Sequence, residues 1–302
     1  MAQQRHLAYA AAMPAICILS PDPAHPEYEA MWPAQRVLLD AALAPAGIVP
    51  TYRPWTGAAP AGFDLVLPLL AWGYPDASAR WLAAIDAWEA AGVPLANPAT
   101  VLRWNSDKTY LLDFAARGAP VVPSVFAAAA GPDALAEARS RFGAGPLVAK
   151  PSISAGARGV VVIAPGDPLP VAALGKPLLL QPMLPAIASE GEYSLIWFGG
   201  IFSHAILKIP RAGDFRVQLQ HGGREIPIVP PPAAMAAAQA VLARIEAPLL
   251  YARVDLVADG AGGYWLMELE LIEPQLFLEH SPDAGRNFAR AVGEAATAAA
   301  PA

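Results

Sequence analysis

Three acidic residues near the C-terminal end of the chain have the types and spacing of a metal site. Asp255 lies in the segment ARVDLV, and Glu268 and Glu270 lie in LMELEL, with a Gly-rich turn between the two segments. Side chains alternate along a strand, so Glu268 and Glu270 share one face, roughly 7 Å apart. The other face, toward a predicted core, takes Met267, Leu269 and Leu271. Carboxylates among apolar residues need a cation, and Mg²⁺ prefers such oxygens, so the pattern predicts a divalent-metal site.

Asp255 reaches the same face only under a condition. It lies on the partner strand of the predicted hairpin, on the same side as Arg253. A shift of one residue in the register turns the side chains of a strand to the other face. The three acids therefore meet only if the turn has an even number of residues or contains a β-bulge.

Lys150 and the loop after it form a second group with chemical potential. Lys150 ends the apolar run PLVAK, and the small-residue sequence SISAGARG follows after Pro151. A lysine at a strand end, before a loop with accessible backbone N–H groups, is typical of a phosphate cradle. The loop is not a Walker A motif, because GxxxxGK[ST] is absent. A plain hairpin turn is the alternative interpretation.

Lys108, in the sequence NSDKTYLL, is ambiguous by itself. A helix is predicted from Asn105 or Ser106 to about Arg117, which places Lys108 in its first turn. The helix macrodipole disfavours a cation there by about 0.3–1 kcal/mol. A solvated lysine paired with Asp107 is the plain alternative to a functional one.

The segment around Gln181 leaves a predicted strand and enters a loop, with Glu190 and Glu192 downstream. Backbone groups at such an exit can bond the edge of an adenine, and a carboxylate can accept hydrogen bonds from ribose hydroxyls. A buried edge strand followed by surface acids explains the pattern equally well.

Composition narrows the functional classes. A chain of 302 residues can form two or three subdomains, and its net charge of −6 argues against a nucleic-acid partner, because phosphate binders carry basic stripes. The single cysteine, Cys17, excludes an internal disulfide and a Cys-based zinc site. No apolar stretch approaches the roughly 20 residues of a membrane span. The segment from Arg5 to Ala12 resembles a signal peptide only faintly, since Pro14 interrupts it, so we expect a cytoplasmic protein.

The first hundred residues alternate between strands and helices. Strands are predicted at 15–20, 48–52 and 63–70, and helices at 28–43 and 78–91. This alternation is typical of a parallel sheet in an open α/β domain. Trp81, Leu82, Ile85 and Trp88 recur at helical spacing and are assigned to the core. No GxGxxG opens the first helix, so a dinucleotide site is unsupported.

The remaining two thirds mix the two element types. Further strands are predicted at 121–125, 147–151, 160–164, 178–182, 192–198 and 201–209, with the acidic hairpin at 251–273. Further helices are predicted at 134–142, 233–247 and 283–298. A polar loop with Arg211, Arg216 and His221 precedes the second of these helices.

Five segments, in their order along the chain, resemble the ATP-grasp superfamily. They are NSDKTYLL, AKPSISAGARG, QPMLPAIASEGEYS, ARVDLV and LMELELIEP. The chain looks most similar to the glutathione-synthetase-like branch, and within it to cycloserine-forming (O-ureidoserine) cyclo-ligases. The resemblance covers about residues 94–290, and the first ninety residues match by fold pattern.

The resemblance implies an α/β and α+β fold with an ATP site between two ATP-grasp subdomains. We expect an N-terminal open α/β domain of the Rossmann-like, pre-ATP-grasp type at 1–97. An ATP-grasp lid subdomain with a linker helix would follow at 98–185. The C-terminal subdomain at 186–302 would carry the metal-binding hairpin.

The same resemblance implies a role for each candidate residue. The phosphates of ATP would meet Lys108, Lys150 and the 152–159 loop, which includes Ser152, Ser154, Gly156 and Gly159. Adenine would lie against Gln181, Met183 and Leu184, and ribose against Glu192, with Glu190 as the nearby alternative. One or two Mg²⁺ ions, with Mn²⁺ as a substitute, would bind Asp255, Glu268 and Glu270. The basic residues facing the transferred phosphate and the acyl-phosphate would be Lys208 and Arg216.

The acidic strand departs from the commoner family pattern in one place. Many relatives have Glu-x-Asn, whereas this chain has Glu268-Leu-Glu270. The extra negative charge requires two divalent ions or neighbouring Lys and Arg side chains to offset it. The number of metal ions is therefore open.

The expected reaction follows from these charges. A substrate carboxylate would attack the γ-phosphate of ATP, and an amine would displace phosphate from the resulting acyl-phosphate to form an amide. The substrates would be small and amino-acid-like, and their pocket would involve residues 203–224 and the 71–76 loop with Trp72. His204 and His221 flank this side, where a structural role is favoured over a chemical one.

The family pattern is compatible with a homo-oligomer. The alternative function is a nucleotide- and metal-binding regulatory module without ligase activity.

Overall fold

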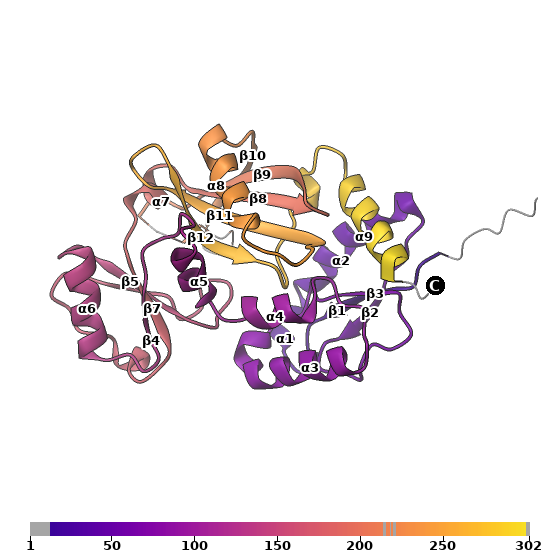
Figure 1. The fold of residues 1–302 in the computed structure, drawn as a ribbon, viewed down its shortest axis with the longest axis horizontal. Helices are drawn as coiled ribbons and strands as arrows, with labels where there is room; N and C mark the ends of the chain where they lie inside the picture. Colours follow the sequence, from indigo (N-terminus) through magenta and orange to yellow (C-terminus); the bar gives the residue numbers. More distant parts are fainter. Residues whose placement is uncertain (1–12, 214–215, 218, 220–221, 300–302) are drawn as a thin grey trace, which may run out of the picture.

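The computed structural model describes residues 13–213, 216–217, 219 and 222–299, and it contains three β-sheets with helices packed on them (Figure 1). The faintly signal-like segment that starts at Arg5 lies outside the described residues, and so does His221 of the polar loop. Within the described ranges, no helix has the length and apolar character needed to cross a membrane.

The first sheet is parallel, with the order β2-β1-β3. Its strands are β1 (Ile16–Ser20), β2 (Thr51–Pro54) and β3 (Leu65–Leu67), and the helices on it are α2 (Trp32–Leu43), α3 (Ser78–Ala90) and α9 (Arg286–Ala299). Ile16 and Ile18 join the core with α2 and α9, whereas Cys17 and Leu19 join the core with α3. The predicted parallel α/β arrangement is confirmed, and Trp81 is fully buried in that second core, as expected.

One predicted helix of this region is wrong in its extent. The segment expected as a single helix at 28–43 forms α1 (Pro26–Glu29) and then α2. Pro33 stands in the first turn of α2. Proline has no N–H to bond a carbonyl of a preceding turn, so it fits the start of a helix and not its interior.

The second sheet is antiparallel, with the order β4-β7-β5-β6. Its elements are β4 (Val125–Ala127), α6 (Pro132–Phe142), β5 (Leu147–Pro151), β6 (Val161–Ile163) and β7 (Leu178–Pro182). The predicted bounds of β5 and β7 are confirmed. Leu135 and Ala138 of α6 pack with Leu147 and Leu180 in a core of this sheet.

The third sheet is also antiparallel, with the order β10-β9-β8-β11-β12. Its elements are β8 (Glu192–Phe198), β9 (Ile201–Ile209), β10 (Arg224–Ile228), α8 (Pro232–Leu242), β11 (Tyr251–Ala258) and β12 (Tyr264–Glu270). The predicted hairpin of β8 and β9 is confirmed, with Gly199 and Gly200 at positive φ of 56° and 76° in its turn. β10 was not predicted, nor was the short helix α7 (Pro185–Ser189).

The connection between the first two sheets corrects a second helix prediction. The chain forms α4 (Ala99–Asn105) and α5 (Tyr110–Ala116) instead of one helix from Asn105 or Ser106 to Arg117. Asn105 does not cap a helix. Its amide group donates to the carbonyl of Leu269 and accepts from the N–H of Leu271, both at 2.9 Å, which ties the end of α4 to the acidic strand. Lys108 consequently lies in the turn between the two helices, before the first residue of α5.

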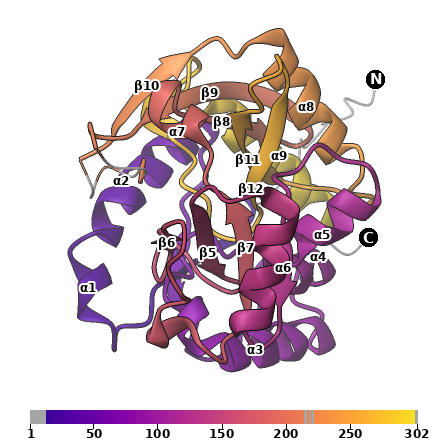
Figure 2. The same ribbon diagram turned by 90° about the vertical axis from the view of Figure 1, so that its left-hand side faces the viewer.

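The sheets meet around a common space. Phe198 and Ile206 of the third sheet share a core with Ile16 and Phe288, so the first and third sheets pack together through α9. The second sheet and α6 lie to one side of this pair (Figure 1). Figure 2 shows the β5–β6 segment facing α1 beneath the third sheet.

Candidate active site

A cavity of about 740 Å³ lies where the three sheets meet. This volume is within the range of about 300–1,000 Å³ that is usual for small-molecule sites. Most of the residues predicted from the sequence line it: Lys108, Lys150, Ser154, Gly156, Gln181, Met183, Leu184, Glu192, Lys208, Arg216, Asp255, Glu268 and Glu270. Residues far apart in the sequence thus line one cavity. Trp72 of the predicted substrate side lines it as well.

Three of the predicted residues do not line the cavity: Ser152, Gly159 and Glu190. Ser152 is fully buried; its Oγ donates to Asp107 Oδ2 at 3.0 Å and its carbonyl accepts from the N–H of Lys108 at 2.7 Å. Gly159 has a φ of +70°, and a Cβ there would lie 2.9 Å from Pro151 Cγ, so glycine lets the loop turn back. Glu190 is exposed.

A β-bulge brings the acids to one face. Asp255 lies opposite Glu268, Arg253 lies opposite Glu270, and the register shifts between Asp255 and Leu256. The connecting turn, residues 259–263, has an odd number of residues, so the bulge meets the condition set by the sequence. Met267 is the extra residue at this bulge, and it lines the cavity. Its predicted place in the core is wrong for this reason.

Arg253 is the centre of charge compensation on this face. Its Nη2 lies 2.9 Å from Asp255 Oδ2 and also donates to Glu270 Oε1. Burial would raise the pKa of Asp255, but Arg253 and Lys208 together hold it below its ordinary value. Burial raises the pKa of Glu270 to about 7, against the opposing effect of Arg253. A basic neighbour thus offsets the additional carboxylate of the Glu-x-Glu pattern.

The two lysines occupy different environments. Lys108 Nζ lies 3.1 Å from Glu268 Oε1 and also donates to the carbonyl of Ser154. The plain alternative of a lysine paired with Asp107 is wrong, because that carboxylate accepts from Ser152 and from the N–H of Thr109. Lys150 forms no ion pair with any residue the structure describes, and burial lowers its pKa. A cavity-facing ammonium group without a carboxylate partner favours an anionic ligand.

Lys208 and Glu192 form a buried ion pair that the sequence did not predict. The two residues lie opposite each other on β8 and β9, with 2.8 Å between Nζ and Oε1. Lys208 Nζ also lies 3.6 Å from Asp255 Oδ2 and 5.6 Å from the ring centre of Phe277. Burial would lower the pKa of Lys208, but the carboxylates of Asp255 and Glu192 hold it above its ordinary value. This lysine links the candidate ribose acid to the candidate metal acids.

The apolar end of the cavity lies at the exit of β7. Met183, Leu184 and Val148 line it, and Gln181 donates from Nε2 to Ser124 Oγ at 2.9 Å. The N–H of Met183 donates to the carbonyl of Pro146. This hydrogen bond fixes the strand exit, so the side chains present a preformed slot between the second and third sheets.

The 152–159 loop reaches across the cavity to α1 and to the turn at residues 74–77. Arg158 donates to Asp76 and lies 3.5 Å from Glu27 Oε1, and its guanidinium is 5.9 Å from the ring centre of Tyr28. This bridge was not predicted from the sequence. Only the positive charge of Arg158 within a run of small residues could have drawn attention to it.

Two other residues have clear structural settings. His204 is buried, its Nε2 is 3.0 Å from the carbonyl of Leu276, and burial lowers its pKa. It does not line the cavity, so the structural role favoured from the sequence holds. Glu273 does line it, although the sequence analysis gave this acid no role. Burial and the neighbouring Glu270 raise the pKa of Glu273 to about 8.

The donor set on β11 and β12 fits a hard divalent cation by its chemistry, since it consists of carboxylate oxygens in a cavity that lysines also line. In this structure Lys108 pairs with Glu268, and Arg253 pairs with Asp255 and Glu270. Among the described residues, the one acid–histidine group whose donor atoms all lie within 4.8 Å is Glu225, Glu279 and His280. A cation at Asp255, Glu268 and Glu270 would therefore replace lysine and arginine contacts.

Comparisons with known proteins agree with this geometry. Residues 16–97 match the family "D-cycloserine synthetase DcsG, N-terminal domain". The chain is 33% identical over 254 residues to the cycloserine biosynthesis protein DcsG of Streptomyces lavendulae, covering 77% of this chain and 83% of the relative. A crystal structure of D-cycloserine synthetase DcsG superposes with a TM-score of 0.78 and 30% identity, covering 93% of this chain and all of that one.

A more distant structure has the same fold. The ATP-grasp ligase PsnB, solved with a phosphomimetic variant of its minimal precursor, Mg and ADP, has a TM-score of 0.62 at 16% identity and covers 93% of this chain and 98% of its own. The predicted fold class and the predicted family are thus confirmed. The chain belongs to the DcsG family of ATP-grasp ligases.

Proposed function

We propose that the chain is an ADP-forming carboxylate–amine ligase that closes a ring on an amino-acid derivative. The observation that carries the proposal is the convergence in one cavity of two lysines, three metal-type acids and two further basic residues, contributed by separate sheets. Membership of the DcsG family supports the substrate class, and O-ureidoserine is the first candidate.

ATP would lie between the second and third sheets. Lys108, Lys150 and the backbone around Gly156 would contact its phosphates, and Ser154 would lie beside them. Gln181, Met183 and Leu184 would enclose adenine. Glu192, with Glu190 as the alternative, would accept from ribose. Ser152 and Gly159 would act by shaping the loop.

Asp255, Glu268 and Glu270 would hold one or two Mg²⁺ ions, with Mn²⁺ as a substitute. Bound there, Mg²⁺ would lower the negative charge that the ATP phosphates present to an attacking carboxylate. In the absence of the ion, the positive charges of Arg253 and Lys208 offset the negative charges of these acids. The ion pair of Arg253 with Glu270 accounts for the accommodation of Glu270 where many relatives have asparagine.

The reaction would proceed in two steps. An oxygen of the substrate carboxylate attacks the γ-phosphorus, the bond to ADP breaks, and an acyl-phosphate forms. A nitrogen of the same molecule then attacks the acyl carbon and loses its proton to solvent, the C–N bond forms, and phosphate leaves with one oxygen of the original carboxylate. Lys208 and Arg216 would offset the charge of the phosphoryl group in both steps, so the protein acts by positioning and electrostatics.

A regulatory module without catalysis has less support. Such a module would tolerate loss of charged residues, whereas the cavity keeps Lys108, Lys150 and all three candidate metal acids. The substrates of such an enzyme are small molecules. We propose that the protein is cytoplasmic.

A screen for ADP release tests the proposed function. Purified protein, Mg·ATP and each member of a set of amino acids and small carboxylates, including both enantiomers of O-ureidoserine, are incubated together. We expect release with at least one amino-acid derivative. A Mg·ATP-induced rise in melting temperature without ADP release across the whole set would favour the regulatory module instead.

A further inference from the structure

Glu273 is a buried acid of the cavity wall that forms no ion pair with any residue the structure describes. Around it, Glu192 pairs with Lys208, Glu268 pairs with Lys108, and Asp255 and Glu270 pair with Arg253. Glu273 lines the same cavity, but no side chain that the structure describes forms an ion pair or hydrogen bond with it. Its carboxylate interacts at short range only with its own backbone N–H.

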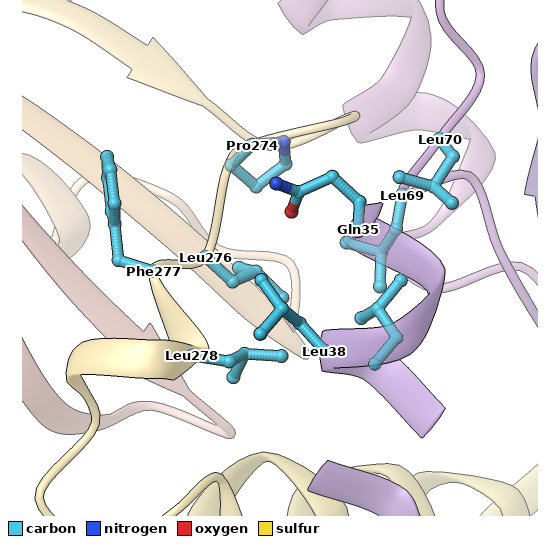
Figure 3. A pocket seen from close by; sticks show the side chains of 9 residues that line it. Gln35, Leu38, Leu69, Leu70, Pro274, Leu276, Phe277 and Leu278 are labelled. Carbon is cyan, nitrogen blue, oxygen red and sulfur yellow. The ribbon is translucent and has the colours of Figure 1, made fainter. Parts of the chain in front are cut away.

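The backbone on either side of Glu273 is held firmly. Tyr251 donates from its hydroxyl to the carbonyl of Ile272 at 2.8 Å, and Asn97 donates to the carbonyl of Leu271 at 2.9 Å. On the other side, Pro274 lines a small pocket with Gln35 and Leu70, between α2 and residues 274–278 (Figure 3). The carboxylate is therefore presented to the cavity from a fixed position, as preorganised binding groups are.

The surroundings of Glu273 suit an organic cation. Burial raises the pKa of Tyr28 and of Tyr74, and the negative charge of Glu273 adds to the rise. Tyr28 and Trp72 form an aromatic pair with ring centres 5.8 Å apart, and both line the cavity. A buried carboxylate without a partner is costly, and a ligand ammonium group removes that cost. Aromatic faces nearby add to the attraction for such a group.

We propose that Glu273 binds the ammonium group of the amino-acid substrate, with the rings of Tyr28 and Trp72 as the adjoining wall. The proposal rests on the proposed ligase function and names the subsite that selects an amino acid over a plain carboxylic acid. An ammonium group held at Glu273 leaves the substrate carboxylate free to face Lys208 and Arg216, the basic residues proposed for the acyl-phosphate.

The test compares two substrates and three variants. The substrates are O-ureidoserine and 3-(ureidooxy)propanoate, which is the same molecule without its amino group. The variants are Glu273→Gln, which keeps the shape and removes the charge, Glu273→Asp, and Glu246→Gln as a control at an exposed acid outside the cavity. Steady-state ADP release gives kcat/KM for each combination.

We expect Glu273→Gln to lower kcat/KM for O-ureidoserine by about 100-fold, mainly through KM, because a buried charge pair loses one partner. For the analogue without the amino group, the same variant should lose less than about 3-fold. Glu273→Asp should recover part of the loss, and Glu246→Gln should match the wild type. The Mg²⁺ concentration for half-maximal rate and the Mg·ATP-induced rise in melting temperature should stay unchanged in Glu273→Gln.

Any other result would contradict the proposed ammonium subsite at Glu273. An equal loss with both substrates, or a raised Mg²⁺ requirement, would assign Glu273 to folding or to the metal and would overturn the ammonium role. Unchanged kinetics in Glu273→Gln would overturn it while leaving the ligase function intact. Failure of the wild type to release ADP with either substrate would overturn the ligase function on this substrate class, and the subsite with it.

Discussion

At the scale of single residues, the cavity wall combines buried ion pairs with charged residues that have no ion-pair partner. Lys150 has no carboxylate partner, and Glu273 has no cation, among the residues that the structure describes. The sequence predicted which residue types converge here, because acids and lysines beside apolar runs are informative. It could not predict the pairing of Glu192 with Lys208 or of Glu270 with Arg253, because those pairs depend on strand register.

Removing one charge from the phosphate and metal contacts should abolish most activity. We expect Glu268→Gln and Lys150→Ala each to lower the rate of ADP release by at least about 100-fold, typical of the loss of one preorganised charged contact. Steady-state kinetics with saturating Mg·ATP measures this, with Glu246→Gln as the matched surface control. A rate within about 5-fold of the wild type in either variant would contradict the role proposed for that residue.

The buried Glu273 should make stability fall as pH rises. Its pKa is about 8 in the folded protein, against an ordinary value near 4.3 when unfolded, so between these values the folded state binds more protons than the unfolded state. Its contribution is full at low pH and is lost as pH rises toward 8. Glu273→Gln removes this dependence.

The prediction concerns the free energy of unfolding without nucleotide and in EDTA. Relative to the wild type, Glu273→Gln should gain at least about 1 kcal/mol between pH 5 and pH 9, since one pKa unit corresponds to about 1.4 kcal/mol. Urea titrations across this range measure the difference. Wild-type and variant profiles that run parallel would show that Glu273 ionises normally in the folded protein.

At the scale of elements, strands with strong apolar runs were predicted with their bounds. β5, β7, β8 and β9 are examples, because Pro and Gly mark their ends. β10 was missed because its five residues, REIPI, are mostly exposed and show no regular apolar alternation. α4 was missed because a seven-residue helix depends on tertiary contacts, here the hydrogen bonds of Asn105 to β12.

The β5–β6 loop is the element whose contacts with α1 and the turn at residues 74–77 most directly concern nucleotide binding. Arg158→Ala removes the contacts with Asp76 and Glu27. More of the binding free energy of ATP is then needed to order the loop over the phosphates. We expect KM for ATP to rise about 2- to 10-fold, as for one or two partly exposed ion pairs, with a smaller change in kcat. The measurement is ADP release over a range of ATP concentrations.

Arg141→Ala is the matched control, since Arg141 is an exposed arginine of α6 that pairs only weakly with Glu137, at 3.8 Å. It should leave KM for ATP unchanged. Equal values for the two arginine variants would mean that the contacts of Arg158 have no part in holding the loop over the nucleotide.

At the scale of the whole molecule, the site exists only because three sheets meet. The first and third sheets share a core that includes α9, so the last helix of the chain returns to the N-terminal unit. Sequence periodicity predicted this helix but not the surface it packs against, because an apolar stripe shows only that one face of a helix is buried. The subdomain boundaries at 97/98 and 185/186 stay predictions.

The central claim is that this cavity activates a carboxylate as an acyl-phosphate. Transfer of oxygen tests it most directly, because the released phosphate must carry one oxygen from the substrate carboxylate. O-ureidoserine labelled with ¹⁸O in both carboxylate oxygens is converted with unlabelled Mg·ATP in unlabelled water, and the phosphate is examined by mass spectrometry. The account predicts one ¹⁸O in each phosphate, with one ADP per cyclic product. Phosphate without ¹⁸O, or AMP in place of ADP, would contradict it.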